Sequence, residues 1–315
     1  MAGFSTGNNE HLIRSNLWST QIKEVLLEEL MGMKYVKMIT DFPDGETLNI
    51  PSIGQAEVID YVEGQAVRYS GMDTGNFTFT INKYKESGTY ITNKMKQDSF
   101  YMSQLVSSFV PKQHRAIMKA MEVDLLATGP DGQTASNVNA INGANHRWVG
   151  SGTSETIDPV DFAKARYALQ KANVPMTNLV ALVDPSVEYK LSTMTNLVNV
   201  SNNKSWEGIV RDGMSTGLQF KMNVYGFDVY ICQNLKSGIA ETVGSLSTTV
   251  GVANMFFSAA SDVLPIVGLI RQQPRVDSEY NKDQQREEYV TTARYGFKLY
   301  RPENMVVVLT DTDQV

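Results

Sequence analysis

The segment NIPSIGQAEVIDYVEGQAVRYSGMDTGNFTFTIN, residues 49–82, decides the fold of this chain. Both of its ends are β-prone, and residues 77–82 alternate apolar and polar side chains, as a half-buried strand does. The middle, residues 55–75, is broken by glycines and holds few large apolar side chains. The pattern predicts a strand, a long polar hairpin and a returning strand.

The hairpin has too little apolar surface to pack on a core of its own, and an isolated hairpin is marginal in water. We therefore expect it to project from the body and to be steadied by another chain. Its charged side chains are candidates for fixing its register on a neighbouring copy. They are Glu57, Asp60, Glu63, Arg68 and Asp73.

The N-terminal residues predict a second appendage. Residues 1–15 are polar and rich in Gly and Asn, which is typical of a loose arm. Apolar side chains then recur at steps of three and four up to Leu30, which predicts an amphipathic helix that Gly32 ends. One helix cannot bury its own stripe, so we expect a neighbour to cover Trp18, Ile22 and Leu26.

The rest of the chain mixes helices and strands. Residues 97–128 predict a long helix with a kink or a break at Pro111, followed by a Gly/Ser/Asn-rich loop to about residue 156. Further predicted elements are a helix from Asp158 to about 172, a strand at 179–183, a short helix to about 194 and strands at 226–231, 263–270, 289–299 and 304–310. A charged loop, DSEYNKDQQREE, separates the strands at 263–270 and 289–299. The class is α+β, without regular βαβ alternation.

Composition narrows the functional classes. The 315 residues carry 28 Lys and Arg against 34 Asp and Glu, and this net charge of −6 argues against a chain whose main surface coats nucleic acid. The single cysteine, Cys232, allows no intrachain disulfide and favours a reducing compartment. No secretory signal or long apolar run is present, so we expect a soluble, unexported protein without a membrane.

Two short motifs suggest chemistry, and neither has the partners it needs. The string GMSTG (213–217) matches a nucleophile elbow at Ser215, but His11, His114 and His146 all precede it, so the order Ser…Asp…His is absent. The acidic spacing over 277–288 resembles a calcium loop with Lys282 where a glycine is required. We predict no catalytic residue, no cofactor and no metal site.

The order of several short words resembles the major capsid proteins of tailed bacteriophages, which have the Hong Kong 97 phage-type fold. These words are NIPSIG (49–54), DYVEG (60–64), MDT (72–74) and FTFTIN (77–82), with later ones at 172–175, 183–185, 226–230 and 295–302. The resemblance extends over most of residues 40–310.

The resemblance implies four parts. They are an N-terminal arm (1–33), an extended loop (52–77), a peripheral domain with a long spine helix (34–51, 78–177 and 263–297) and an axial domain (178–262 and 298–315). Family members that cross-link the subunits of their shells through an isopeptide bond use a lysine in the extended loop. No lysine lies between Gln55 and Asn82, so we do not expect that bond here.

The same resemblance implies a function. The chain is expected to assemble as hexamers and pentamers into an icosahedral shell around double-stranded DNA in the virion, made in the host bacterial cytoplasm. Expected partners are further copies, portal and scaffolding proteins, a cement protein and DNA held non-specifically. Lys112, Arg115 and Lys119 are candidate basic spots at the inner surface, and a plain solvated helix face is the alternative interpretation of these residues. The alternative is an encapsulin-like compartment shell, and a remote one is a hydrolase using Ser215.

Overall fold

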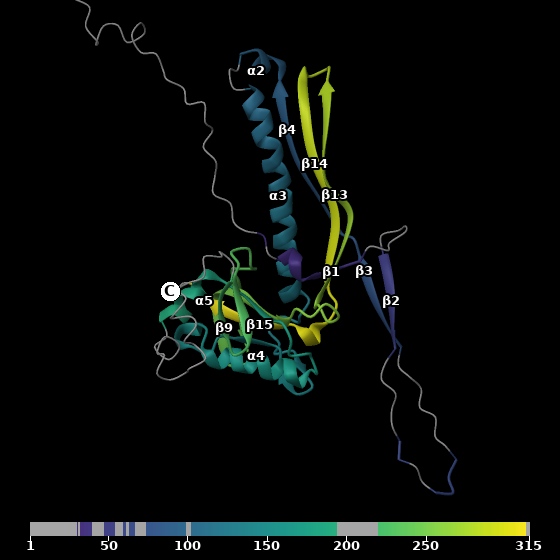
Figure 1. Ribbon diagram of the computed structural model, residues 1–315, viewed down its shortest axis with the longest axis vertical. Coiled ribbons are helices and arrows are strands. Elements are labelled where there is room, and N and C mark those ends of the chain that lie inside the picture. Colours follow the sequence, from purple (N-terminus) through teal and green to yellow (C-terminus); the bar gives the residue numbers. More distant parts are fainter. Residues whose placement is uncertain are drawn as a thin grey trace, which may run out of the picture.

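Two main sheets and one long helix organise the structure. The computed structural model describes residues 30, 32–39, 47–53, 59–60, 63–66, 74–98, 102–193 and 220–312. One sheet has the strand order β1-β13-β14-β4, and the other has the order β7-β15-β12-β8-β10-β9 with β11 paired to β12. Figure 1 shows α3 running along the four-stranded sheet and ending at the body that surrounds the seven-stranded one. The predicted α+β class is confirmed.

The helices are α2 (Asn93–Asp98), α3 (Met102–Asp131), α4 (Pro159–Lys171) and α5 (Pro185–Thr193), with short 3-10 turns η1 (Gly32–Tyr35), η2 (Thr153–Glu155) and η5 (Pro302–Asn304). The four-stranded sheet contains β1 (Val36–Met38), β4 (Lys83–Thr92), β13 (Ile266–Asn281) and β14 (Arg286–Leu299). The seven-stranded sheet contains β7 (Arg147–Val149), β8 (Leu179–Val183), β9 (Phe220–Val224), β10 (Phe227–Ile231), β11 (Ile239–Val243), β12 (Leu246–Ser258) and β15 (Val306–Asp311). Two further pairs are β2 (Thr47–Ile53) with β3 (Thr74–Thr80) and β5 (Ala140–Ile141) with β6 (Ala144–Asn145).

The peripheral layer consists of α3 packed on the β4, β13 and β14 side of the four-stranded sheet. Ile117 and Met121 of α3 are buried against Ala293 and Tyr295 of β14. The helix passes through Pro111 without interruption, so of the predicted kink or break the break is wrong, and the kink stays a prediction. Proline removes one backbone donor, and the packing of the following turns on the sheet holds the helix together across that loss.

The predicted charged loop is mostly strand. β13 continues to Asn281 and β14 begins at Arg286, which leaves residues 282–285 as the turn of a long antiparallel ribbon. Arg286 donates through Nε to Glu288 Oε1 at 2.6 Å, and its guanidinium lies 4.5 Å from the ring centre of Tyr90 on β4. Polar side chains on a solvent-facing ribbon can thus form a strand although their composition is typical of a loop.

The axial layer is the seven-stranded sheet with α4 and α5 packed in the same cluster. Phe162 of α4 meets Phe256 of β12 edge to face, with ring centres 5.1 Å apart, and Phe227 of β10 lies 5.4 Å from Phe256. α4 begins as the sequence predicts, because Asp158 caps it in a capping box and Pro159 occupies the first turn.

The segment 78–177 is divided between the two layers. β4 and α3 belong to the peripheral layer, whereas β7 joins the seven-stranded sheet and α4 packs on it. On this packing we propose a peripheral–axial boundary near residue 132 instead of 177. β7, β11 and β12 were absent from the predicted elements, although β12 lies between β15 and β8 inside the sheet.

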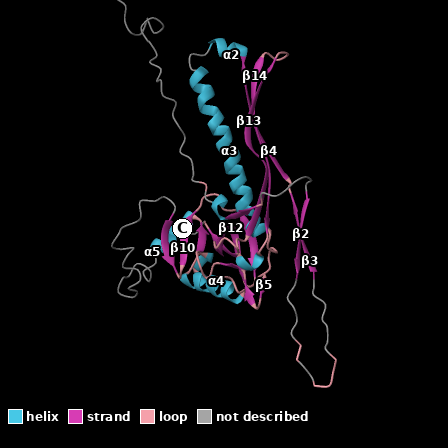
Figure 2. Cartoon of the chain, turned by 45° about the vertical axis from the view of Figure 1, so that its right-hand side comes forward, coloured by secondary structure: helices cyan, strands magenta, loops and turns pink. Residues whose placement is uncertain are grey.

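The two predicted strands are confirmed as β2 and β3, which pair antiparallel from Thr47 with Thr80 to Ile53 with Thr74, and most of the predicted hairpin between them lies outside the described residues. Figures 1 and 2 show this pair extending away from the body. Its base is held, because Phe79 is buried against Leu269 and the ring of Phe77 meets Tyr300 edge to face at 4.9 Å.

The end of α3 approaches β14 closely enough to require a glycine. A Cβ built on Gly132 would lie 2.6 Å from Cβ of Leu299. We expect Gly132→Ala to lower the free energy of unfolding by about 1–3 kcal/mol, as overpacking does. Urea denaturation of the unassembled chain measures this change. Gly88→Ala is the matched control, because its nearest neighbour atom is 3.8 Å away, and equal losses for both variants would contradict the packing argument.

Candidate assembly surfaces and the joint between the layers

The structure places part of the predicted interface. Asp60 and Glu63 of the extended loop are exposed, and Ile59 beside them is 38% exposed. Glu57, Arg68 and Asp73 lie outside the described residues, as do the arm residues Trp18, Ile22 and Leu26 and the motif residue Ser215.

The root of the N-terminal arm, residues 32–36, contacts both layers. The backbone N–H of Gly32 donates to Glu122 Oε1 of α3 at 2.6 Å. Tyr35 packs edge to face on Phe257 of β12 with ring centres 5.4 Å apart, and burial raises the pKa of the Tyr35 phenol. Val36 then pairs with Ile266 in the parallel β1–β13 contact. Residues before this root are thus attached at a fixed point.

The three predicted basic spots lie on α3. Lys112 and Lys119 are exposed and Arg115 is half-buried, at helical steps of three and four. The acidic side chains of this part of α3 are used inside the protein. Asp124 accepts from Tyr295 Oη at 2.7 Å and lies within 4 Å of two lysines of β4, and Glu122 is fully buried. The exposed basic side chains of this part of α3 therefore lie on the side away from these two acids.

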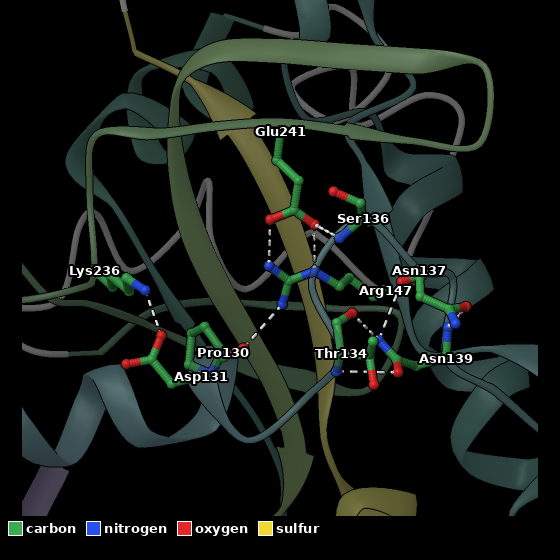
Figure 3. A network of polar contacts seen from close by, with 9 residues as sticks. All are labelled: Pro130, Asp131, Thr134, Ser136, Asn137, Asn139, Arg147, Lys236 and Glu241. Atoms are coloured by element: carbon green, nitrogen blue, oxygen red, sulfur yellow. Dashed lines mark hydrogen bonds and ion pairs between the residues drawn. The ribbon is translucent and has the colours of Figure 1, made fainter.

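A buried ion pair joins the end of α3 to the axial sheet (Figure 3). Arg147 donates through Nε and Nη2 to the two carboxylate oxygens of Glu241 at 2.8 and 2.7 Å, and through Nη1 to the carbonyl of Pro130 at 3.1 Å. The side chains of Arg147 and Glu241 are 3% and 5% exposed. Nearby, Lys236 pairs with Asp131 in the last turn of α3. These contacts connect α3, β7 and β11 at one point.

Glu241 is charged in this setting. The hydrogen bonds from Arg147 are the main cause that lowers the pKa of its carboxyl, with a further contribution from the backbone N–H of Ser136, which donates at 2.6 Å. Sequence reasoning missed this pair, because its members are 94 residues apart and belong to no motif.

The motifs considered in the sequence, a serine nucleophile and a calcium loop, each need partner side chains, and the described residues that could serve are placed as follows. His146 is buried, its Nδ1 lies 3.0 Å from the carbonyl of Ala144, and burial lowers its pKa. The thiol of Cys232 is buried, which raises its pKa to about 11. The calcium-like spacing runs along the paired strands of the ribbon. Within the described ranges, no group of three or more His, Cys, Asp or Glu is placed to hold a metal ion.

Comparison with protein families gives a match to the phage capsid protein model over residues 76–308, which extends from β3 into β15. The chain belongs to this family. A search of curated proteins gives no match. None of the helices among the described residues is long and apolar enough to cross a membrane.

Solved structures agree on the fold. A chain in the capsid structure of cyanophage P-SCSP1u matches with a TM-score of 0.73 and 13% identity over 98% of this chain and 95% of that chain. A chain of Mycobacterium phage Che8 matches at 0.70 and 17% over 95% and 97%, and one from the cyanophage Pam1 capsid at 0.70 and 12% over 99% of each. The phage capsid protein therefore has the Hong Kong 97-like capsid fold expected from its sequence, and the family match does not favour the encapsulin alternative.

The joint predicts a strong dependence of stability on Glu241. We expect Glu241→Gln to cost about 3–5 kcal/mol of unfolding free energy, because it leaves the buried Arg147 without a counter-charge. The double variant Arg147→Met with Glu241→Leu removes both charges. Its loss of unfolding free energy should be smaller than the sum of the losses in Arg147→Met alone and Glu241→Leu alone. Urea unfolding of the unassembled chain measures each value, and additive losses would contradict a coupled pair.

The same pair predicts a pH dependence. The pKa of Glu241 is lowered on folding, so its contribution is complete above the ordinary value of 4.5 and is lost as the pH falls through that value toward the folded pKa. Between pH 7 and pH 4, the wild-type chain should therefore lose more stability than Glu241→Gln does. Parallel pH profiles would show that the carboxylate contributes nothing.

Proposed function

We propose that this capsid protein assembles as hexamers and pentamers into the icosahedral shell of a tailed phage and encloses its double-stranded DNA. The observation that supports this most is the β2–β3 pair, which extends away from the body and, among its described residues, packs on it at the base. A chain with such an appendage gains stability from a neighbour. Closed shells form when each copy makes the same heterologous contacts with the next.

The extended loop is proposed to lie over an adjacent copy, where Glu57, Asp60, Glu63, Arg68 and Asp73 fix its register. Asp60 and Glu63 are exposed, so their carboxylates are available to a partner. Charges at an interface rim contribute orientation and specificity more than affinity. Several neighbours in contact at once add their contributions through effective concentration, so no single contact needs to be strong.

Removal of the loop tests this proposal. Replacing residues 56–74 with a short Gly/Ser turn should leave a folded monomer, because the base contacts of Phe79 and Phe77 remain, and it should abolish shells. Negative-stain electron microscopy with sedimentation velocity detects shells, and circular dichroism checks the fold. A control with only residues 64–66 replaced keeps the proposed interface charges and should assemble. Normal shells from the shortened chain would overturn the role of the loop.

The outer face of α3 is proposed to meet packaged DNA at the inner surface through Lys112, Arg115 and Lys119. Phosphate contacts of this kind are independent of sequence and weaken with salt. An acidic subunit with a few basic side chains would bind DNA only weakly, and weak binding suits a shell that must release its DNA.

Charge reversal tests the inner surface. Lys112→Glu with Lys119→Glu should leave shells intact and lower the mass of DNA that they retain, with a larger deficit at low salt because screening is weaker. Shell counts by electron microscopy and DNA content by the ratio of absorbance at 260 and 280 nm measure the two effects. Lys94→Glu with Lys282→Glu is the control of equal charge. Unchanged DNA content in the first variant would remove the proposal.

We also propose portal, scaffolding and cement proteins as partners, and assembly in the host bacterial cytoplasm before release in the virion. A structural role in the shell requires no catalysis, and we propose that the chain is not an enzyme. Expression alone followed by negative-stain imaging separates shells or capsomers from the small discrete particles of a hydrolase. Neighbouring portal and terminase genes, against a cargo enzyme gene, separate a phage shell from an encapsulin-like compartment.

A further inference from the structure

The outward side of α4 combines apolar and basic side chains. Val160 and Tyr167 are each 52% exposed, and Ala163 between them is exposed too. Lys164, with 51% of its side chain exposed, and Lys171 follow the same side at steps of four and seven. The opposite side of the helix contains Phe162, Ala165 and Leu169, which are buried in the axial core.

No acidic side chain of α4 reaches this outward surface. Asp158 caps the helix and accepts from the N–H of Val160 at 3.0 Å. Asp161 is fully buried and accepts from Trp148 Nε1 and from the N–H groups of Ser151 and Asp158. Lys164 Nζ lies 3.8 Å from Asp161 Oδ1, so that lysine is partly compensated. The surface is therefore apolar with a surplus of positive charge.

The turn between β9 and β10 extends this surface. Arg166 of α4 donates through Nη1 to the carbonyl of Tyr225 at 2.8 Å, and the Tyr225 side chain is 49% exposed. Nucleic acid would pair with the lysines and leave Val160 and Ala163 without a partner. An amphipathic helix with an acidic flank would satisfy both kinds of side chain.

The sequence predicts such a helix. Trp18, Ile22 and Leu26 lie outside the described residues, and their spacing predicts an apolar stripe that one helix cannot bury alone, with Glu24 and Glu28 along one side of it. The segment carries one lysine against three glutamates. Its charge and its apolar stripe complement those of the α4 surface.

The attachment of the arm favours a neighbouring copy as the donor of this predicted helix. The root of a subunit's own arm packs on one face of the seven-stranded sheet, where Tyr35 contacts Phe257. α4 packs on the other face, where Phe162 contacts Phe256, and adjacent residues of a strand point to opposite faces. A subunit's own arm would have to pass around the sheet to reach α4, and this favours another subunit as the donor.

We propose that the outward surface of α4 docks the acidic amphipathic helix, residues 16–30, of a neighbouring copy. This proposal rests on the proposed assembly into shells. It assigns a role to the exposed apolar side chains of α4 and to the apolar stripe predicted for the arm.

Charge exchange tests the docking. Lys164→Glu with Lys171→Glu should weaken the contact about tenfold, as the loss of two ion pairs does, and so reduce the assembled fraction in sedimentation velocity. Adding Glu24→Lys and Glu28→Lys to the same chain should restore it. Lys94→Glu with Lys190→Glu is the control of equal charge. It should assemble normally, and adding the same arm changes to it should weaken assembly, because Lys164 and Lys171 are then intact. Full assembly of the α4 variant, failure of rescue, or intact shells that lack only DNA would each overturn the proposal.

A cross-link identifies the donor. In a Cys232→Ala background, Leu26→Cys with Ala163→Cys should give disulfide-linked dimers and longer ladders when shells are oxidised. Leu26→Cys with Tyr189→Cys is the matched control on α5 and should remain monomeric on the gel. An intrachain bond, or shells without any cross-link, would overturn docking by a neighbour. If the wild-type chain forms no shells at all, the proposed function fails instead.

Discussion

The last turn of α3 is the contact on which the position of the whole peripheral layer depends. Gly129 approaches the axial sheet so closely that an added Cβ would lie 2.9 Å from Met255 Sδ. One residue later, the carbonyl of Pro130 accepts from Arg147, whose charge is balanced by Glu241. Because α3 packs on β14 over several turns, fixing its end on the axial sheet also fixes the ribbon and the base of the extended loop. Buried charges are costly unless fully paired, and this joint meets that condition.

Elements with local signals were predictable from the sequence. Asp158 followed by Pro159 marks the start of α4 through side-chain capping and the fixed φ of proline, which depend on no distant residue. β3 alternates because one of its faces packs at Phe79 while the other meets solvent. The projection of the extended loop was predictable in the same way. A polar segment between two strands has too few apolar side chains to pack on the core of its own chain.

Elements defined by distant partners were not predictable. β12 is buried on both faces, so it lacks alternation, and Asn254 within it makes sense only because its amide donates to Val308 and Thr310 of β15. The ribbon at 277–288 has a loop-like composition and becomes strand through cross-strand pairing. Of the assembly surfaces, the basic side of α3 could be found by its spacing, whereas Arg147 and Glu241 carry no signal until the fold brings them together.

The charge of the chain illustrates why a total says little about a surface. With a net charge of −6 the protein is acidic, yet Glu122 and Asp124 of α3 are consumed by internal partners, the backbone of Gly32 and the phenol of Tyr295. Burying acids in this way separates them from the exposed lysines of the same helix. α4 repeats the arrangement with Asp161 inside and Lys164 outside. The acidic side chains that bond inside each layer thus help to decide the sign of the field at the surface of its helix.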